Sequence, residues 1–348
     1  MIRLQQRAAP PPGFVLAMPV AAVVVTFALT AGIVLAAGAN PVEAYEQFLI
    51  TPLRSEFGVL EVLVSMTPIL FTGAAVALAF RAGYWNIGAE GQLMCGAIAA
   101  AWVGQVVDGW PRVAVLPVMV ALGALAGAVW ALAPALLRIS FGIDEVVTTL
   151  LLNPVALFIV SGLLNGPWRD PETRFPESPR IAAGAEFPQL VDRSRLHLGF
   201  VLALVIVAIG WFVTTRTATG VRLRAVGLSP RGARFAGISV ERTLLGAALV
   251  SGAIAGIAGV SEVAGIQFRL TEGLSAGFGF TGVVVATLGG LSMIGVAAAA
   301  FFLGLVNVGA GTASRVLDVP SQVGGIITAA LLLVAVALLI FRRYRIAR

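Results

Sequence analysis

Long apolar runs recur along almost the whole chain, and the short segments between them carry most of the charged residues. The runs fall near residues 13–38, 58–80, 88–107, 113–137, 145–165, 198–215, 243–266, 276–291, 294–312 and 322–341. A helix needs about 20 apolar residues to cross a bilayer. The pattern therefore predicts an all-α polytopic membrane protein with about ten transmembrane helices in a single transmembrane domain, residues 1–348. The run at 276–291 is short and rich in glycine, so it either crosses fully or forms a re-entrant segment.

The composition supports this class. Hydrophobic residues make up 59% of the chain and charged residues 11%, whereas soluble domains carry about 25% charged residues. A water-exposed surface cannot be built from so few charges. The first apolar run is longer than the ~7–15 apolar residues of a signal peptide, so it is expected to remain as a helix.

The distribution of the basic residues predicts the orientation in the membrane. All 23 of them are arginines, and with the N-terminus inside, fourteen fall on the inner side while most acidic residues fall outside. An excess of arginine in short cytoplasmic loops is the positive-inside pattern, so both termini are expected in the cytoplasm. Because the arginines are scattered over short loops, they do not indicate a nucleic-acid partner.

Residue types that are rare in the chain exclude several activities. There is no lysine, so the chain cannot hold the G-x-x-x-x-G-K-[ST] loop that binds ATP. His197 is the only histidine, which excludes multi-histidine metal sites and histidine-based catalytic triads. Cys95 is the only cysteine, so no disulfide forms within the chain. We therefore expect no catalytic residue, no metal and no cofactor, and any ATP that drives the protein is expected to bind a partner subunit.

The stretch FRAGYWNIGAEGQ, from Phe80 to Gln92, interrupts the apolar pattern with polar residues and three glycines. One interpretation is a helix start near the inner interface, where Asn86 caps a helix beginning at Ile87 and Glu90 lies in its first turn. The other interpretation is a broken helix. Irregular backbone at membrane depth is tolerated only against protein or a watery cavity, and such segments line substrate paths in transporters.

Further polar residues lie within the apolar runs. Glu145, Thr149 and Asn153 recur at intervals of four and so share one face of a helix. A charged group that faces lipid costs several kcal/mol, so these side chains are expected to face the protein interior. The predicted translocation path comprises Asn86, Glu90, Gln92, Glu145, Thr149, Asn153, Glu262 and Asn307. For each of them, a hydrogen bond between helices is the alternative to contact with a solute.

Two longer polar connections stand out. The outer one, about 166–196, is rich in proline and is a candidate docking surface. The inner one, about 216–242, carries the signals of a short helix near 230–236: Ser229 suits the N-cap, Pro230 the first turn and Gly237 the residue past the end. We expect this helix to contact a cytoplasmic partner, with a solvated charged loop as the alternative. The residues assigned to this ATPase-coupling role are Ser229, Pro230, Arg231, Arg234, Phe235 and Gly237.

Small residues at four-residue spacing predict close helix packing. The pairs are Gly123 with Gly127, Gly252 with Gly256, and Gly273 with Gly277. A weak internal repeat also appears, because NIGAEGQ and GFGFTGVVVATLGG are the glycine-rich openings of two segments five spans apart. An odd offset reverses the orientation in the membrane, which is the pattern of an inverted repeat.

Four stretches together resemble permease subunits of ABC importers: FRAGYWNIGAEGQLMCGAIAAAW, FGIDEVVTTLLLN, LRAVGLSPRGARFAGI and GFGFTGVVVATLGG. They span residues 80 to 290 in the family's order and spacing. The branch that they resemble contains the basic-membrane-protein-type nucleoside importers. The wider group includes the ribose, simple-sugar and branched-chain amino-acid permeases.

The resemblance implies a type II importer fold of about ten helices, with broken helices and an inverted repeat. It also implies a second, homologous permease chain, two cytoplasmic ATPase chains and an extracytoplasmic substrate-binding lipoprotein, all at a bacterial cytoplasmic (inner) membrane. The segment Ser229 to Gly237 would then be the coupling helix.

The function implied is the translocation path of an ATP-driven importer for nucleosides or related sugar-like solutes. One alternative is a permease for simple sugars, ribose-like or galactose-like, of the same superfamily. Another is a proton-coupled secondary transporter with Glu90 or Glu262 as the proton carrier and no ATPase chains. An intramembrane hydrolase is disfavoured, because no span contains a His or Lys base.

Overall fold

The structure is a computed structural model. It describes residues 3–6, 12–107, 109–317 and 344–347, together with 320, 322–323, 325–327, 329–330, 333–334 and 337. The helices are α1 (Pro12–Ala36), α2 (Pro41–Leu49), α3 (Glu56–Arg81), α4 (Ala89–Val106), α5 (Arg112–Phe141), α6 (Glu145–Leu164), α7 (Leu198–Arg216), α8 (Ala218–Leu228), α9 (Pro230–Phe235), α10 (Val240–Glu262), α11 (Phe278–Leu288) and α12 (Met293–Leu317). Short helical turns are η1 (Thr51–Leu53), η2 (Ala183–Ala185) and the π-helical turn η3 (Val263–Gln267).

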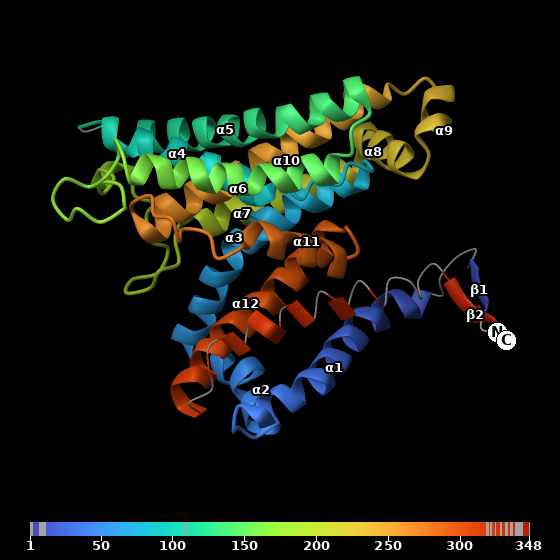
Figure 1. Cartoon of the computed structure of the whole chain (residues 1–348), viewed down its shortest axis with the longest axis horizontal. Coiled ribbons are helices and arrows are strands. Elements are labelled where there is room, and N and C mark those ends of the chain that lie inside the picture. The colour runs from blue at the N-terminus through green and yellow to red at the C-terminus, as the bar shows by residue number, and fades with distance from the viewer. Residues whose placement is uncertain are drawn as a thin grey trace.

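Two four-residue strands, β1 (Arg3–Gln6) and β2 (Tyr344–Ala347), pair antiparallel and bring the two ends of the chain together (Figure 1). This pairing places both termini on one side of the molecule. The remainder of the described chain is helix and connecting loop, which confirms the predicted all-α class of membrane protein apart from this terminal ribbon.

Six helices of the described chain are long and apolar enough to cross a membrane, and the bent pair Val20–Ala36 with Pro41–Leu53, at 119°, makes seven if counted as one span. The six are α3, α5, α6, α7, α10 with η3, and α12. The prediction of about ten membrane spans also counted α4 and the 11-residue α11, which are not among these six helices. It further counted the run at 322–341, much of which lies outside the described residues.

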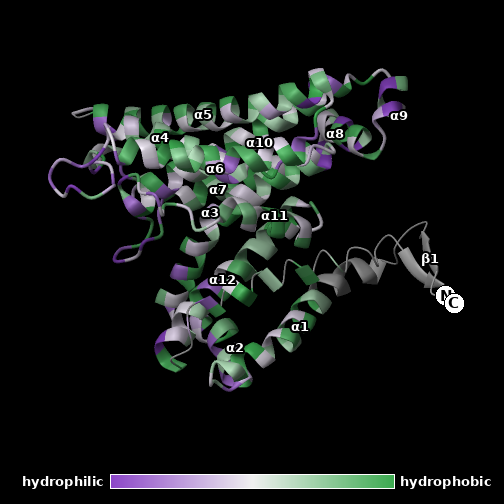
Figure 2. Cartoon of the chain, in the orientation of Figure 1, coloured by the Kyte–Doolittle hydropathy of each residue, from purple (hydrophilic) through white to green (hydrophobic). Residues whose placement is uncertain are grey.

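The helices form two groups that share α3 (Figure 1). In one group α4, α5, α6, α7 and α10 lie alongside one another, and in the other α1 and α2 lie with α12. Buried apolar side chains of α3, α4 and α10 make the main core, and a smaller cluster joins α1, α2 and α12. Hydrophobic residues cover the outer faces of α5 and α6 (Figure 2), where Val129 and Phe158 are exposed, as suits contact with lipid.

Glycine contacts hold α4, α5 and α10 together. A Cβ on Gly127 would overlap the carbonyl oxygen of Gly252, and a Cβ on Gly96 would overlap that of Gly256. The backbones of the three helices therefore touch, as small residues at membrane-helix interfaces allow. This confirms packing for the first two predicted glycine pairs. The third pair was wrong as a helix contact, because Gly273 and Gly277 lie in the loop before α11.

Loops at the end of the bundle that is predicted to be outer form one layer. We call residues 165–197, between α6 and α7, the outer cap, and residues 268–277, between η3 and α11, the connector. Main-chain hydrogen bonds join them: the Ser178 amide donates to the Leu270 carbonyl at 2.9 Å, and the Ile181 amide to the Phe268 carbonyl at 2.9 Å. The helices α8 and α9 lie at the opposite end of the bundle (Figure 1).

Candidate functional site

The segment between α3 and α4 is irregular, and it is the centre of the candidate site. Residues 82–88 form no helix, and Gly83 has a positive φ of 76°. The backbone groups of such a segment lose their helical partners, so at membrane depth they need others from the protein. One neighbouring helix, α6, supplies such partners through the side chains of Glu145, Thr149 and Asn153.

Asn86 lies at the middle of the first polar cluster and is fully buried. Its Nδ2 donates to Gln92 Oε1 at 2.9 Å and to Ser251 Oγ at 2.8 Å, while Gln92 Nε2 donates to Asn86 Oδ1 at 3.0 Å. Ser251 Oγ in turn donates to the Ala75 carbonyl at 2.7 Å. The two amides thus form a reciprocal pair, and the cluster joins α3, α4 and α10.

One face of α6 binds the backbone of the broken segment. Asn153 Oδ1 accepts from the Gly91 amide at 2.9 Å, and Asn153 Nδ2 donates to the Ile87 carbonyl at 2.9 Å. Thr149 Oγ1 accepts from the Ile87 amide at 3.2 Å. Glu145, one turn earlier, accepts from the Trp85 amide at 3.3 Å. The shared helix face predicted for Glu145, Thr149 and Asn153 is confirmed.

Glu145 also forms an ion pair. Its Oε2 lies 3.0 Å from Nε of Arg138, near the end of α5. Glu145 is buried while Arg138 is partly exposed. The pair therefore balances the charge of a buried carboxylate at the inner end of α6. Asp144, just before it, caps α6 by accepting from the Val146 amide at 2.8 Å, which agrees with helix-start chemistry at this position.

The predicted helix start at Ile87 was wrong by two residues. The helix α4 begins at Ala89, and its N-cap is Gly88, with no side-chain cap hydrogen bond. Asn86 Oδ1 accepts instead from the Gly88 amide at 2.9 Å. This contact closes a local turn of the kind that Asn favours, before the helix starts. Asn86 therefore shapes the broken segment and does not cap α4.

Glu90 joins the starts of two helices. Its Oε2 accepts from the Gly279 amide, in the first turn of α11, at 2.7 Å. A Cβ on Gly279 would overlap the backbone of Glu90, so the first turns of α4 and α11 lie in contact. Thr72 Oγ1 of α3 donates to the Phe278 carbonyl at 2.8 Å, at the same place.

The helices α4 and α11 run in opposite directions from this common start. At the far end of α11, Arg81 Nε donates to the Leu291 carbonyl at 2.7 Å, so α11 follows α3 from Thr72 towards its inner end. By contrast, α4 leads back to the outer side, where the Gly104 carbonyl accepts from the outer-cap residue Ala182. Two short helices that diverge from one point are the arrangement expected of an inverted repeat with broken helices. The segment at 276–291 therefore begins inside the bundle.

Glu262 and Asn307 lie apart from this cluster. Glu262 is buried at the outer end of α10, within electrostatic range of Arg195. Arg195 Nε donates to Glu61 Oε1 of α3 at 3.2 Å. Asn307 is exposed on α12, in the other helix group. Of the eight predicted path residues, Asn86, Glu90, Gln92, Glu145, Thr149 and Asn153 surround the broken segment and bind groups of this chain. A path role for these eight residues stays a prediction.

The short inner helix is present as predicted. In α9, Ser229 Oγ accepts from the Gly232 amide at 3.1 Å, Pro230 is the first residue and Gly237 follows the end with a φ of 78°. Arg234 forms an ion pair with Glu241 of α10. Phe235 is 97% exposed, although it is a large apolar side chain. The role of this helix in coupling stays a prediction.

Sequence reasoning missed three residues of the site and one helix. Thr72, Ser251 and Gly279 are single small residues in small-residue runs, and their partners lie between 165 and 206 positions away, so no local pattern marked them. The helix α8 precedes α9 in the inner connection, for which the sequence pattern predicts one short helix only. An N-cap candidate, Thr217, stands directly before it.

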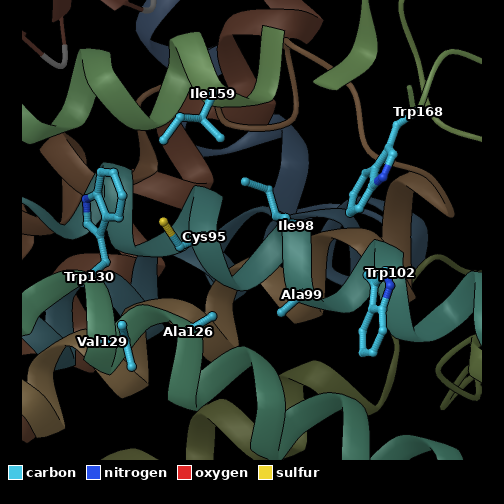
Figure 3. A pocket seen from close by; sticks show the side chains of 9 residues that line it. All are labelled: Cys95, Ile98, Ala99, Trp102, Ala126, Val129, Trp130, Ile159 and Trp168. Carbon is cyan, nitrogen blue, oxygen red and sulfur yellow. The ribbon is translucent and has the colours of Figure 1, made fainter. Parts of the chain in front are cut away.

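A separate apolar cavity of about 410 Å³ opens between α4, α5 and α6 (Figure 3). Three tryptophans, Trp102, Trp130 and Trp168, lie around it together with Cys95. No charged side chain lines this cavity, so it differs in chemistry from the polar cluster at the broken segment.

Comparison with known proteins identifies the family. The family described as "Branched-chain amino acid transport system / permease component" matches residues 58–336 of the chain. The chain belongs to this family. It is 36% identical over 323 residues to a guanosine ABC transporter permease protein of Bacillus subtilis, covering 91% of this chain and 92% of that one. It is 35% identical over 355 residues to a glucose ABC transporter permease protein of Haloferax volcanii, covering 99% and 93%.

A third relative is a nucleoside ABC transporter permease protein of Lactococcus lactis, 33% identical over 324 residues and covering 90% of this chain and 89% of that one. All three are permease subunits, and each is matched over nearly its whole length. The present chain is therefore a multi-pass ABC permease subunit, a component of a transport channel.

Proposed function

We propose that this permease forms the translocation path of an ATP-driven importer for nucleosides, in the cytoplasmic membrane of a bacterium. The observation that carries the proposal is the similarity, over nine tenths of the chain, to the guanosine and nucleoside permeases. The similarity to a glucose permease keeps simple sugars as the second candidate. Both solutes are uncharged and carry several hydroxyl groups.

The chemistry of the candidate site agrees with such a solute. Asn86, Gln92, Thr149 and Asn153 are neutral side chains that both donate and accept hydrogen bonds. Their hydrogen bonds in this chain are made with protein groups, so a passing solute would exchange with contacts that already exist. Weak and exchangeable contacts favour passage through a path, while tight binding is left to a separate receptor.

ATP is proposed to act through partner chains. Without lysine the chain has no ATP-binding loop of its own, so a pair of cytoplasmic ATPase chains would supply the energy. The exposed Phe235 of α9 is an apolar surface for such a chain, and apolar aromatic residues are typical anchors of interfaces. A second permease chain and a substrate-binding lipoprotein at the outer cap would complete the importer. The α9 end and both termini would then face the cytoplasm.

Uptake in cells tests the proposal. Cells that lack their own nucleoside and glucose importers would receive the complete operon, with labelled guanosine and labelled glucose supplied separately. The matched control carries the same operon with this permease deleted. Permease-dependent guanosine uptake that excess unlabelled nucleoside abolishes supports the nucleoside assignment. Permease-dependent uptake of glucose alone would replace it by the sugar assignment, and uptake of neither solute would overturn both.

A further inference from the structure

Several contacts join the outer cap to the connector. Besides the two main-chain hydrogen bonds, Ser178 Oγ accepts from the Leu270 amide at 2.9 Å, and Arg269 forms an ion pair with Glu177. The connector also contacts α6, where Glu272 accepts from Ser161 Oγ at 2.6 Å. The connector is therefore attached to the cap along its first half, and Leu270 at this attachment is buried.

The connector leads directly into α11. Its last residue, Gly277, is the N-cap of α11, and the amide of the first helical residue, Phe278, donates to Ser275 Oγ of the connector at 3.2 Å. Within two residues of the connector lie two hydrogen bonds that join the start of α11 to other helices: the Phe278 carbonyl binds Thr72, and the Gly279 amide binds Glu90. A displacement of the connector therefore acts first on these two contacts.

Glu90 is the charged residue at the contact between the first turns of α4 and α11. Its carboxylate forms no ion pair within the part of the chain that the structure describes, and it accepts a hydrogen bond from the Gly279 main-chain amide. The first turns of α4 and α11 both present the positive ends of their helix dipoles to it. A buried carboxylate is stabilised there only while both helix starts stay in place, which makes the contact sensitive to any shift of α11.

We propose that Glu90 is a positioning residue that locks α11 to α4 in the resting complex, and that a protein docked on the outer cap releases this lock by pulling the connector. The inference rests on the proposed function, because it needs an importer with an outer binding protein. The lock gives a physical route from the outer surface to the middle of the bundle. It runs from the cap through residues 268–277 to Gly279 and Glu90.

The first test measures ATPase activity of the complete complex in lipid nanodiscs, with and without the loaded binding protein. We compare wild type, Glu90→Gln, Glu90→Ala and the control Glu56→Gln, which changes an exposed first-turn glutamate of α3. The lock predicts that basal ATPase rises at least threefold in Glu90→Ala and less in Glu90→Gln, because an amide oxygen still accepts a hydrogen bond. Stimulation by the binding protein should fall from several-fold towards onefold. The ratio of stimulated to basal ATPase activity does not depend on how much complex is recovered.

The second test leaves Glu90 in place, so it holds even if the Glu90 variants fail to assemble. Cys95→Ala removes the only cysteine, and Ala276→Cys then places one thiol at an exposed connector position. We expect a membrane-impermeant maleimide to modify this thiol at least fivefold faster once the loaded binding protein is added. A thiol at the exposed outer position Val113, from Val113→Cys, should react at an unchanged rate.

The outcomes separate the two proposals. If the wild-type complex is stimulated by its binding protein but the Glu90 variants match Glu56→Gln, the lock is refuted while the importer stands. An unchanged rate of thiol modification at position 276 refutes the connector as the route. If the wild-type complex shows no ATPase activity and no uptake of any tested solute, the failure lies in the proposed function itself.

Discussion

The side chain of Asn153 holds the broken segment from two directions, with Oδ1 accepting from the Gly91 amide and Nδ2 donating to the Ile87 carbonyl, each at 2.9 Å. These two backbone groups lie on either side of the start of α4. One amide side chain on α6 thus replaces contacts that a continuous helix would have made within itself. In the candidate site, polar side chains thus take the place of the intrahelical partners of these backbone groups.

Replacing Asn153 by leucine should destabilise the permease. The change leaves the Gly91 amide and the Ile87 carbonyl buried without their partner, and each unsatisfied group costs about 1–3 kcal/mol. We expect a loss of about 2–4 kcal/mol, seen as a lower midpoint of thermal unfolding in detergent. The control is Asn165→Leu, at the residue just after the same helix, whose side-chain hydrogen bonds are exposed to solvent. Equal midpoints for the two variants would show that the Asn153 hydrogen bonds contribute nothing to stability.

Two glycines of α10 allow the effect of close packing on stability to be distinguished from the effect of helix propensity. A Cβ on Gly256 would overlap the Gly123 carbonyl, whereas nothing lies within 4 Å of a Cβ on Gly246. Gly256→Ala should lower stability by about 1–3 kcal/mol through overpacking. Gly246→Ala should leave it unchanged or raise it by up to about 1 kcal/mol, since alanine is the better helix former. The measurement is unfolding in a denaturing detergent, and a Gly256→Ala variant as stable as Gly246→Ala would contradict the glycine contact between α5 and α10.

His197 should make stability depend on pH. It lies just before α7, accepts from the Gly199 amide through Nδ1 at 3.1 Å, and burial lowers its pKa from 6.5 to about 4. The unfolded chain therefore binds a proton below pH 6.5 that the folded chain does not. Stability contributed by the neutral ring is complete above pH 6.5 and decreases as the pH falls towards 4, by about 2 kcal/mol at pH 5.

The matched variant for this effect is His197→Asn, because asparagine also caps helices but does not titrate. Thermal unfolding of both proteins between pH 7.5 and 4.5 isolates the histidine, since all other titrating groups are shared. We expect the midpoint of the wild type to fall more steeply. Parallel curves would mean that His197 is protonated equally in the folded and unfolded states.

The exposed face of α9 should affect coupling without affecting folding. Phe235→Ala removes an apolar side chain that is 97% exposed, so unfolding of the isolated permease should not change. Binding-protein-stimulated ATPase of the complex should fall at least fivefold if this side chain anchors an ATPase chain. Val113→Ala, an 86% exposed apolar position at the other end of the bundle, is the control. Normal stimulation in Phe235→Ala would remove this residue from the coupling surface.

Charge reversal distinguishes the roles of Arg231 and Arg234, the two arginines of α9. Arg234 pairs with Glu241, so Arg234→Glu alone disturbs the attachment of α9 to α10. The double change Arg234→Glu with Glu241→Arg restores the pair and should restore stimulated ATPase. Arg231→Glu should lower stimulation directly if Arg231 contacts the ATPase chain. If the restored pair stays inactive while the complex assembles, Arg234 itself touches the partner.

The sequence was informative where a local pattern decides the structure. Ser229, Pro230 and Gly237 are start and stop signals that act within one turn, and α9 lies where they predict it. The spacing of Glu145, Thr149 and Asn153 fixed one helix face, because periodicity needs only the helix itself. Asn86 was harder to place. Asparagine favours both helix caps and turns. Here it forms a turn with Gly88, and α4 begins only after that turn, at Ala89.

Contacts between distant segments could not be predicted in this way. The approach of Gly279 to Glu90 joins residues 189 positions apart, and it depends on how α11 packs against α3 and α4. The repeated glycine-rich openings hinted at a relation between the two segments but not at their contact. Gly273 and Gly277 show the opposite error, because spacing suggested helix packing in a segment that forms a loop.

The most direct test of the central claim is transport in vesicles with the ATP supply under control. The permease, its partner permease and the ATPase chains would be reconstituted in proteoliposomes that hold ATP on the α9 side, with the loaded binding protein on the cap side. Labelled guanosine should accumulate inside only when ATP and active ATPase chains are both present, and a proton gradient alone should drive none. Accumulation that persists with inactive ATPase chains and collapses with the proton gradient would contradict the account and identify a secondary transporter.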